Sequence, residues 1–146
     1  MTLLGQVAVA AFLTLVTIAI HGACTAAILK SLSVLHIGHW VMRSQARMVA
    51  AIAMLVVVML GASIVEASVW AVAYLLAGAI DSAETALYFS IVTFTTLGYG
   101  EIVLNEGWRV LASLQAATGI VVFGWTTALV IATVQRIAGL AGASTP

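Results

Sequence analysis

A polar, flexible strip lies between two of the most apolar segments of the chain. The strip, residues 93–101, reads TFTTLGYGE and holds two glycines, four hydroxyl side chains and one carboxylate. Gly98 and Gly100 alternate with larger residues, and glycine reaches backbone conformations closed to other residues, so that carbonyl oxygens can all turn to one side. Rings of carbonyl oxygens can replace the hydration shell of a cation. The strip therefore predicts a site where main-chain oxygens bind a dehydrated cation.

One copy of the strip cannot surround an ion, so this chemistry requires several copies of the chain. Four strips around a common axis would stack their carbonyl oxygens in rings. Thr96 would add a ring of hydroxyl groups at the inner end. We therefore expect a homotetramer.

The composition of the chain places these strips in a membrane. The chain has 146 residues, of which 64% are hydrophobic and 7% are charged. A soluble globule of about 150 residues buries only about 70% of its chain surface, which is too little to hide so much apolar surface. The formal net charge is zero, so bulk electrostatics gives no reason to expect a nucleic-acid partner. Membrane lipids are the expected surroundings, and the single Cys24 excludes a disulfide within the chain.

Three apolar segments are long enough to cross the membrane: residues 3–29, 48–80 and 110–134. Each exceeds the roughly 20 residues that span a hydrocarbon core. The first is longer than the ~7–15-residue core of a signal peptide and follows no Lys or Arg, which favours a retained helix. The second is too long for one perpendicular crossing, so either it is tilted or its later part leaves the membrane.

The charged residues indicate how the chain is oriented. Residues 31–47 contain Trp40, two histidines and two arginines, which suits a linker at the membrane surface. If the chain crosses three times, four of the five basic residues fall on the side of this linker: Lys30, Arg43, Arg47 and Arg136. Four acidic residues fall on the other side, around the strip: Asp81, Glu84, Glu101 and Glu106. The excess of basic residues predicts a cytoplasmic linker and C-terminus and an N-terminus outside.

A short helix is expected directly before the strip. Asp81-Ser82-Ala83-Glu84 predicts a helix start, because an N-cap candidate is followed by an acid at the capping-box spacing. The helix would run from about Ser82 to Phe94, which is too short to cross. It must enter the membrane and stop there, with the negative end of its dipole at bilayer depth, where it favours a cation.

These residues resemble the pore signature of potassium channels. Residues 86–101, ALYFSIVTFTTLGYGE, align without gaps with the pore helix and filter of bacterial two-helix potassium channels, and TGIVVFGWTTA, residues 118–128, is similar to their inner helix. The resemblance covers roughly residues 46–137. It implies an all-α membrane protein with three transmembrane helices, a re-entrant pore helix and a selectivity-filter loop, assembled as a homotetramer. The implied divisions are an additional helix (1–30), a cytoplasmic interfacial linker (31–47), the pore domain (48–137) and a short cytoplasmic tail (138–146).

The resemblance also implies roles for individual residues. Potassium ions would be bound by the backbone carbonyls of the filter residues, which are Thr96, Leu97, Gly98, Tyr99 and Gly100. The hydroxyl of Thr96 would bind them as well. The filter and its outer mouth would be supported by Val92, Thr95 and Glu101. Gly119 takes the position of a gating hinge, and four residues would face or flank the water-filled cavity: Ile120, Phe123, Thr127 and Ile131. Gln135 would lie near the inner constriction.

The strip departs from the family pattern at several positions. Leu97 replaces the usual Val, and Glu101 replaces the usual Asp. Val92 stands where some bacterial channels carry a carboxylate that pairs with the outer acid, so filter inactivation that depends on that pair is in doubt. Tyr88 and Phe89 stand where tryptophans are often found.

The sequence thus predicts a potassium-selective channel in a bacterial plasma membrane that conducts passively. It would be no enzyme and would need no cofactor, with K⁺ as the permeant ligand. Two alternatives stay open: a weakly selective cation channel, or a non-conducting regulatory subunit with a pore-like fold. No apolar segment carries arginines at three-residue spacing, so no voltage sensor of the usual kind is expected.

Glu66 and Gln115 are polar residues inside apolar segments. An ionised residue at the centre of a membrane helix costs roughly 2.5–3.5 kcal/mol, so such groups usually face protein or water. Glu66 is therefore a candidate proton sensor, a hydrogen-bond partner that supports the pore helix, or a structural residue. Gln115 is expected to form hydrogen bonds across helices.

Overall fold

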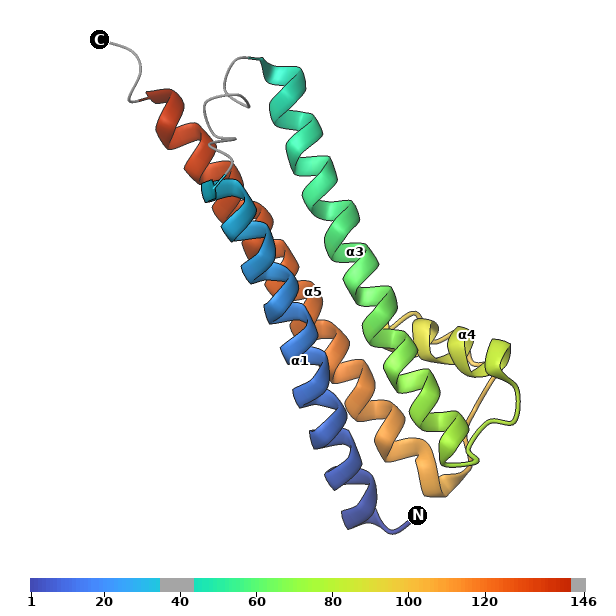
Figure 1. The fold of residues 1–146 in the computed structure, drawn as a ribbon. Helices are drawn as coiled ribbons and strands as arrows, with labels where there is room; N and C mark the ends of the chain where they lie inside the picture. Colours follow the sequence, from blue (N-terminus) through green and yellow to red (C-terminus); the bar gives the residue numbers. More distant parts are fainter. Residues whose placement is uncertain (35–43, 143–146) are drawn as a thin grey trace.

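Three long helices lie side by side, and a short helix packs against one end of the bundle (Figure 1). The computed structural model describes residues 1–34 and 44–142. Within them the chain forms α1 (Leu3–Val34), α3 (Gln45–Leu76), α4 (Ala83–Phe94) and α5 (Glu106–Gly142). Residues 35–43 of the predicted linker, which include Trp40 and Arg43, lie outside the described residues.

Three of these helices are long and apolar enough to cross a membrane. The qualifying spans are Leu3–Ser31, Gln45–Leu76 and Glu106–Arg136. Apolar side chains such as Phe12, Leu60 and Val121 are exposed on the outside of the bundle, which is the expected surface for a helix surrounded by lipid. The prediction of an all-α membrane protein with three spanning helices is confirmed for the described residues.

The end of α3 is set by one glycine. Gly78 has a φ of 67°, and its amide donates to the carbonyl of Leu75 at 3.0 Å while the amide of Ala79 donates to Tyr74 at 2.9 Å. This pair of bonds is a Schellman motif, which requires a left-handed residue just after the helix. The helix therefore stops at Leu76, four residues before the predicted limit. Its 32 residues still measure about 48 Å, more than a bilayer core of about 30 Å.

The start of α4 differs by one residue from the prediction. The N-cap is Ser82, whose hydroxyl accepts from the amide of Thr85 at 3.4 Å, and the helix begins at Ala83. Asp81 therefore lies outside the helix, and Glu84 lies in the first turn without the capping-box spacing. The hydroxyl of Ser82 reaches the free amide three residues ahead, which is the usual geometry of a serine cap. Glu84 still favours this helix end through the helix dipole.

Helix α1 runs parallel to α5 at a nearly constant register (Figure 1). Three polar contacts join the two helices. The Leu111 amide donates to Gln6 Oε1 at 3.2 Å, the hydroxyls of Thr14 and Thr118 lie 2.8 Å apart, and Thr126 Oγ1 lies 3.2 Å from His21 Nε2. The sequence separations of these pairs are 105, 104 and 105 residues. The contacts recur about every seven residues of each helix, which is the spacing of helices packed at a small angle.

Helix α1 also contacts α3, so it lies in the groove between two helices. Trp70 is fully buried, and its indole donates to Thr17 Oγ1 at 3.0 Å. His21 and Glu66 are fully buried as well, and His21 Nδ1 lies 3.0 Å from Glu66 Oε1. In a bilayer, where apolar surfaces do not drive helices together, such polar contacts and close packing hold α1 in place.

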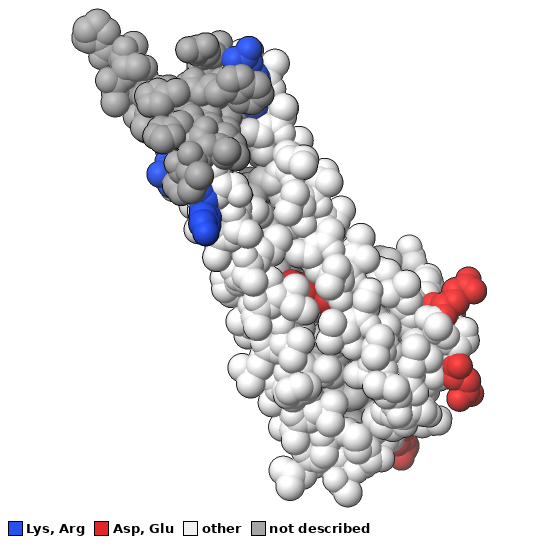
Figure 2. All heavy atoms as spheres, in the orientation of Figure 1, with Lys and Arg blue, Asp and Glu red and all other residues white. Residues whose placement is uncertain are grey.

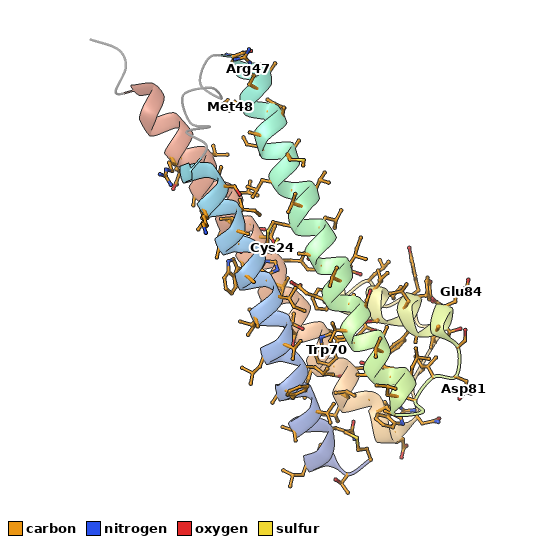
Figure 3. The ribbon with its side chains drawn as sticks, in the orientation of Figure 1. Cys24, Arg47, Met48, Trp70, Asp81 and Glu84 are labelled. Atoms are coloured by element: carbon orange, nitrogen blue, oxygen red, sulfur yellow. The ribbon has the colours of Figure 1, made fainter. Side chains whose placement is uncertain are left out.

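Charge is divided between the two ends of the bundle. Most Lys and Arg side chains gather at the end that carries the C-terminus, while most Asp and Glu side chains lie at the other end, around α4, and one acidic patch lies midway along the bundle (Figure 2). Arg47 and Met48 lie at the first end, and Asp81 and Glu84 at the second (Figure 3). The short helix and the strip are therefore at the acidic end.

Candidate functional site

The strip begins as the capped end of α4. The amide of Thr96 donates to the carbonyl of Thr93 at 3.0 Å, and the amide of Leu97 donates to Val92 at 2.9 Å. These bonds form a second Schellman motif, with Thr96 in the left-handed position at a φ of 59°. Glycine usually takes this position because a side chain there costs about 1–2 kcal/mol. The hydrogen bonds to α4 hold Thr96 in this conformation.

The backbone of the strip alternates in handedness. The φ angles of Thr96, Gly98 and Gly100 are 59°, 55° and 89°, and the residues between them have no positive φ. A Cβ at Gly98 or Gly100 would meet nothing within 4 Å. The conformation, and not a lack of space, therefore requires glycine at these two positions.

The first three amides of the strip, those of Thr96, Leu97 and Gly98, bond back to α4, and its carbonyls accept no hydrogen bond from the described residues. Besides the two bonds above, the amide of Gly98 donates to the carbonyl of Val92 at 3.4 Å. Within the described part of the chain, no hydrogen bond is accepted by the carbonyls of residues 96–100. Oxygen atoms without a partner on an alternating backbone are a suitable ligand set for a dehydrated cation.

Of the residues predicted to support the strip, Val92 contacts it through its main-chain carbonyl, and Thr95 binds the last turn of α4 through its hydroxyl. Val92 is buried, and its carbonyl accepts from the amides of Leu97 and Gly98 and from the hydroxyl of Thr95 at 3.3 Å. Thr95 also donates to Ile91 at 2.8 Å. Val92 therefore supports the strip through its main-chain carbonyl, and its apolar side chain forms no pair with Glu101.

The outer end of the strip is tied to α4 by a contact that the sequence analysis missed. The hydroxyl of Tyr88 donates to Glu101 Oε1. This hydrogen bond, together with the nearby charge of Glu101, raises the pKa of Tyr88. The contact joins the second turn of α4 to the residue after Gly100.

One side of the strip lacks protein contacts in a single chain. Leu97 and Tyr99 are 53% and 69% exposed, and the whole segment from Thr95 to Glu101 is exposed. In contrast, the residues of α4 that face α3 and α5 are buried, including Phe89, Ser90 and Phe94. The strip is thus supported from behind and open in front, as a site shared between copies of the chain would be.

Gly119 lets α5 approach the end of α4. A Cβ on Gly119 would lie 1.8 Å from the carbonyl oxygen of Phe94 and 2.8 Å from its carbonyl carbon. The rings of Phe94 and Phe123 pack edge to face beside this contact, with centroids 5.9 Å apart. Gly119 was predicted as a hinge. The structure adds a second reason for glycine here, because the close approach of Phe94 leaves no room for a side chain. Phe123 lies half-buried in this contact.

The other residues predicted to line a cavity share one exposed face of α5. Ile120 and Ile131 are 63% and 52% exposed, and Thr127 and Gln135 are exposed too. Their spacing of seven, four and four residues places them along one stripe of a helix. This stripe continues from the level of the strip toward the basic end of the bundle.

Glu66 lies away from the strip and contacts α1. Its Oε1 atom pairs with His21 as described above, and its Oε2 atom is buried without a hydrogen-bond partner among the described residues. The ring of His21 also packs edge-on to Trp125, with centroids 5.4 Å apart. Within the described residues, none of the hydrogen bonds of Glu66 reaches α4, so the structure does not show it as a partner of that helix.

The comparison with known proteins gives one match. A family model described as "Ion channel" matches residues 53–136, which is more than half of the chain. The match includes most of α3, all of α4, the strip, and α5 as far as Arg136, and α1 lies outside it. No curated protein and no solved structure matches the chain.

We predict that Gly119→Ala destabilises the protein. The new methyl group would overlap the Phe94 carbonyl, and overpacking of this kind costs about 1–3 kcal/mol or more. The measurement is the thermal unfolding of the purified protein in detergent. Gly124→Ala on the same helix is the matched control, because a Cβ there meets nothing within 4 Å. Equal unfolding temperatures for the two variants would contradict the close approach.

Proposed function

The chain belongs to the ion channel family, and we propose that it forms a potassium-selective channel in which residues 96–100 of four copies are the selectivity filter. The observation that carries this proposal is the backbone of the strip. Its φ angles alternate in sign, the amides of its first three residues are bound to α4, and its carbonyls have no partner within the described residues. The family is consistent with the potassium channel pore that the sequence resembles.

Four copies complete the site. The carbonyls of Thr96, Leu97, Gly98 and Tyr99 would form successive rings around K⁺, and the hydroxyl of Thr96 would add an inner ring. The exposed front of the strip supports this arrangement, since one copy offers ligands from one side only. The stripe of Ile120, Thr127 and Ile131 would then line the cavity below the filter, and Gln135 its inner end.

The position of α4 in the membrane favours a cation. As a member of this family with three helices able to span a bilayer, the chain is an integral multi-pass membrane protein. The carbonyl end of α4 lies against Gly119, near the middle of the span Glu106–Arg136. The negative end of the helix dipole is therefore inside the membrane, where few other groups screen it.

The charge at the two ends of the bundle supports an orientation. The basic end would lie in the cytoplasm by the positive-inside rule, which places the C-terminus there and the N-terminus outside. The strip would then open to the outside, with Glu101 and the other acidic residues around its mouth. Conduction through such a pore is passive, so it includes no enzymatic step.

The proposal is tested by ion flux from proteoliposomes that hold the purified tetramer. We expect K⁺ flux that barium blocks and that disappears when Na⁺ replaces K⁺. Gly98→Ala is the matched negative control, because it forces a side chain into the left-handed region. Comparable Na⁺ flux would indicate a weakly selective cation channel. Absence of flux from a confirmed tetramer, over a range of pH and membrane tension, would indicate a closed channel or a non-conducting regulatory subunit.

We predict that Tyr88→Phe shortens the time for which the filter conducts. The substitution removes the hydrogen bond to Glu101 that ties the outer end of the filter to α4. The measurement is the decay of single-tetramer current during sustained opening. Tyr88→Trp is the control, because its indole N–H keeps a donor on the ring, and it should restore most of the duration.

The same contact has a defined pH dependence. Because the pKa of Tyr88 is raised, the neutral hydroxyl donates throughout the neutral range, and its contribution is lost only as the pH rises through that raised value. The wild type and Tyr88→Phe should therefore differ at pH 7 and converge at strongly alkaline pH. Identical current decay at pH 7 would contradict a role for the contact.

We also propose Glu66 as a proton sensor for gating. The titratable side chain that faces it among the described residues is His21 of α1, and from α5 the hydroxyl of Thr126 reaches the other side of the His21 ring. A change of charge at this pair would therefore alter a contact that joins all three long helices.

Glu66→Gln should flatten the pH dependence of K⁺ flux, because the amide does not change its charge. Asp81→Asn serves as the control, since it removes an exposed carboxylate outside the helices. Flux would be measured in proteoliposomes from about pH 4 to pH 9, a range that includes the ordinary titration of Glu and His side chains. An unchanged pH profile for Glu66→Gln would rule out the sensor.

A further inference from the structure

A buried polar cluster joins α3, α4 and α5 behind the strip. It consists of Tyr74 on α3, Ser90 on α4 and Gln115 on α5, and all three side chains are fully buried. Buried polar side chains between membrane helices are retained where they bind one another across the interface. The cluster is separate from the strip and from the pair of His21 and Glu66.

Every polar group of the cluster has a partner. Gln115 Oε1 accepts from the hydroxyl of Tyr74 at 2.8 Å, and Gln115 Nε2 donates to Ser90 twice, to its carbonyl at 3.2 Å and to its hydroxyl at 2.6 Å. The hydroxyl of Ser90 donates in turn to the carbonyl of Ala67 on α3. The amide of Gln115 has one orientation here, because the Ser90 carbonyl accepts only and must face the NH₂ group.

The cluster lies one helical turn from the close contact at the end of α4. Ser90 precedes Phe94 by four residues, and Gln115 precedes Gly119 by four residues, so both contacts use the same faces of the two helices. The carbonyl of Phe94 meets the backbone of Gly119, while Ser90 is held by Gln115. Two contacts one turn apart fix both the depth and the tilt of α4 relative to α5.

The position of α4 determines the position of the carbonyl ligands. Thr96 and Leu97 are hydrogen-bonded to the carbonyls of Thr93 and Val92 in the last turn of α4. A rotation or shift of α4 therefore moves the first residues of the strip with it. Apolar contacts along α4 allow such small shifts, because they have no preferred direction. The hydrogen bonds to Ser90 are directional and therefore resist them.

We propose that Gln115 is a positioning residue for the filter. By holding Ser90 of α4 between α3 and α5, it keeps the carbonyl rings at the spacing that binds K⁺. This inference rests on the proposed potassium channel function. Hydrogen bonds between membrane helices contribute little to overall stability on average, so loss of Gln115 should weaken K⁺ binding more than it weakens the fold.

The test compares ion binding with stability in one experiment. The unfolding temperature of the detergent-solubilised tetramer is measured while K⁺ replaces Na⁺ at constant ionic strength. A bound ion raises this temperature as its concentration exceeds its dissociation constant. For Gln115→Met, which keeps the length of the side chain without its polar groups, we expect about tenfold more K⁺ to be needed for the same increase. The unfolding temperature without K⁺ should change little.

One further variant tests the Ser90 side of the cluster, and another serves as a control outside it. Ser90→Ala removes the α4 hydroxyl and should move the K⁺ requirement in the same direction as Gln115→Met. Ser113→Ala is the matched control on α5, because its exposed hydroxyl donates only to Arg109 of its own helix and should leave the K⁺ requirement unchanged. If Gln115→Met does not assemble, Ser90→Ala decides the question alone.

The outcomes distinguish this inference from the proposed function. An equal fall in unfolding temperature at every K⁺ concentration would make Gln115 a merely structural residue and would overturn the inference. An unchanged K⁺ requirement in both Gln115→Met and Ser90→Ala would overturn it as well, while the channel function would stand. A wild-type tetramer that shows neither K⁺-dependent stability nor K⁺ flux would overturn the function, and the inference with it.

Discussion

The hydrogen bond from the amide of Leu97 to the carbonyl of Val92 connects the strip to the rest of the protein. Through this bond and its neighbour at Thr96, the direction in which the strip leaves α4 is set by the last turn of that helix. The amides of Thr96, Leu97 and Gly98 are used within the protein, while the carbonyls of the strip are left for another ligand. The positions of those oxygens then depend on how firmly α3 and α5 hold a helix of only 12 residues.

A short helix that ends inside a membrane must be covered by protein, since lipid cannot satisfy its free backbone groups. In this chain α3 and α5 provide that cover, and Gly119 lets α5 contact the backbone of α4 directly. The same constraint explains the polar residues found within the apolar segments. Gln6, Thr14, Thr17 and Gln115 all form contacts between helices; three of them are buried and Thr14 is half-buried.

The sequence predicted the parts of the fold that depend on local pattern. Apolar length located the three spans, and the glycines of residues 93–101 identified the strip. Contacts between helices were harder to predict, because α1, α3 and α5 are apolar on all sides and show no face that marks their neighbours. The close approach at Gly119 and the pairing of His21 with Glu66 depend on the rotation and tilt of whole helices. The pair of Tyr88 and Glu101 was missed because it joins residues separated by the strip itself, whose path no periodic pattern describes.

The constant register between α1 and α5 has a mechanical consequence. Contacts at Thr118 and Thr126 lie on either side of residues 119–125, the segment in which a bend at Gly119 would develop. Two helices joined by side-chain contacts along their length are stiffer than the same helices apart, because bending the pair strains the contacts between them. Any bend of α5 in this segment must therefore be followed by α1, or must break the contact at His21.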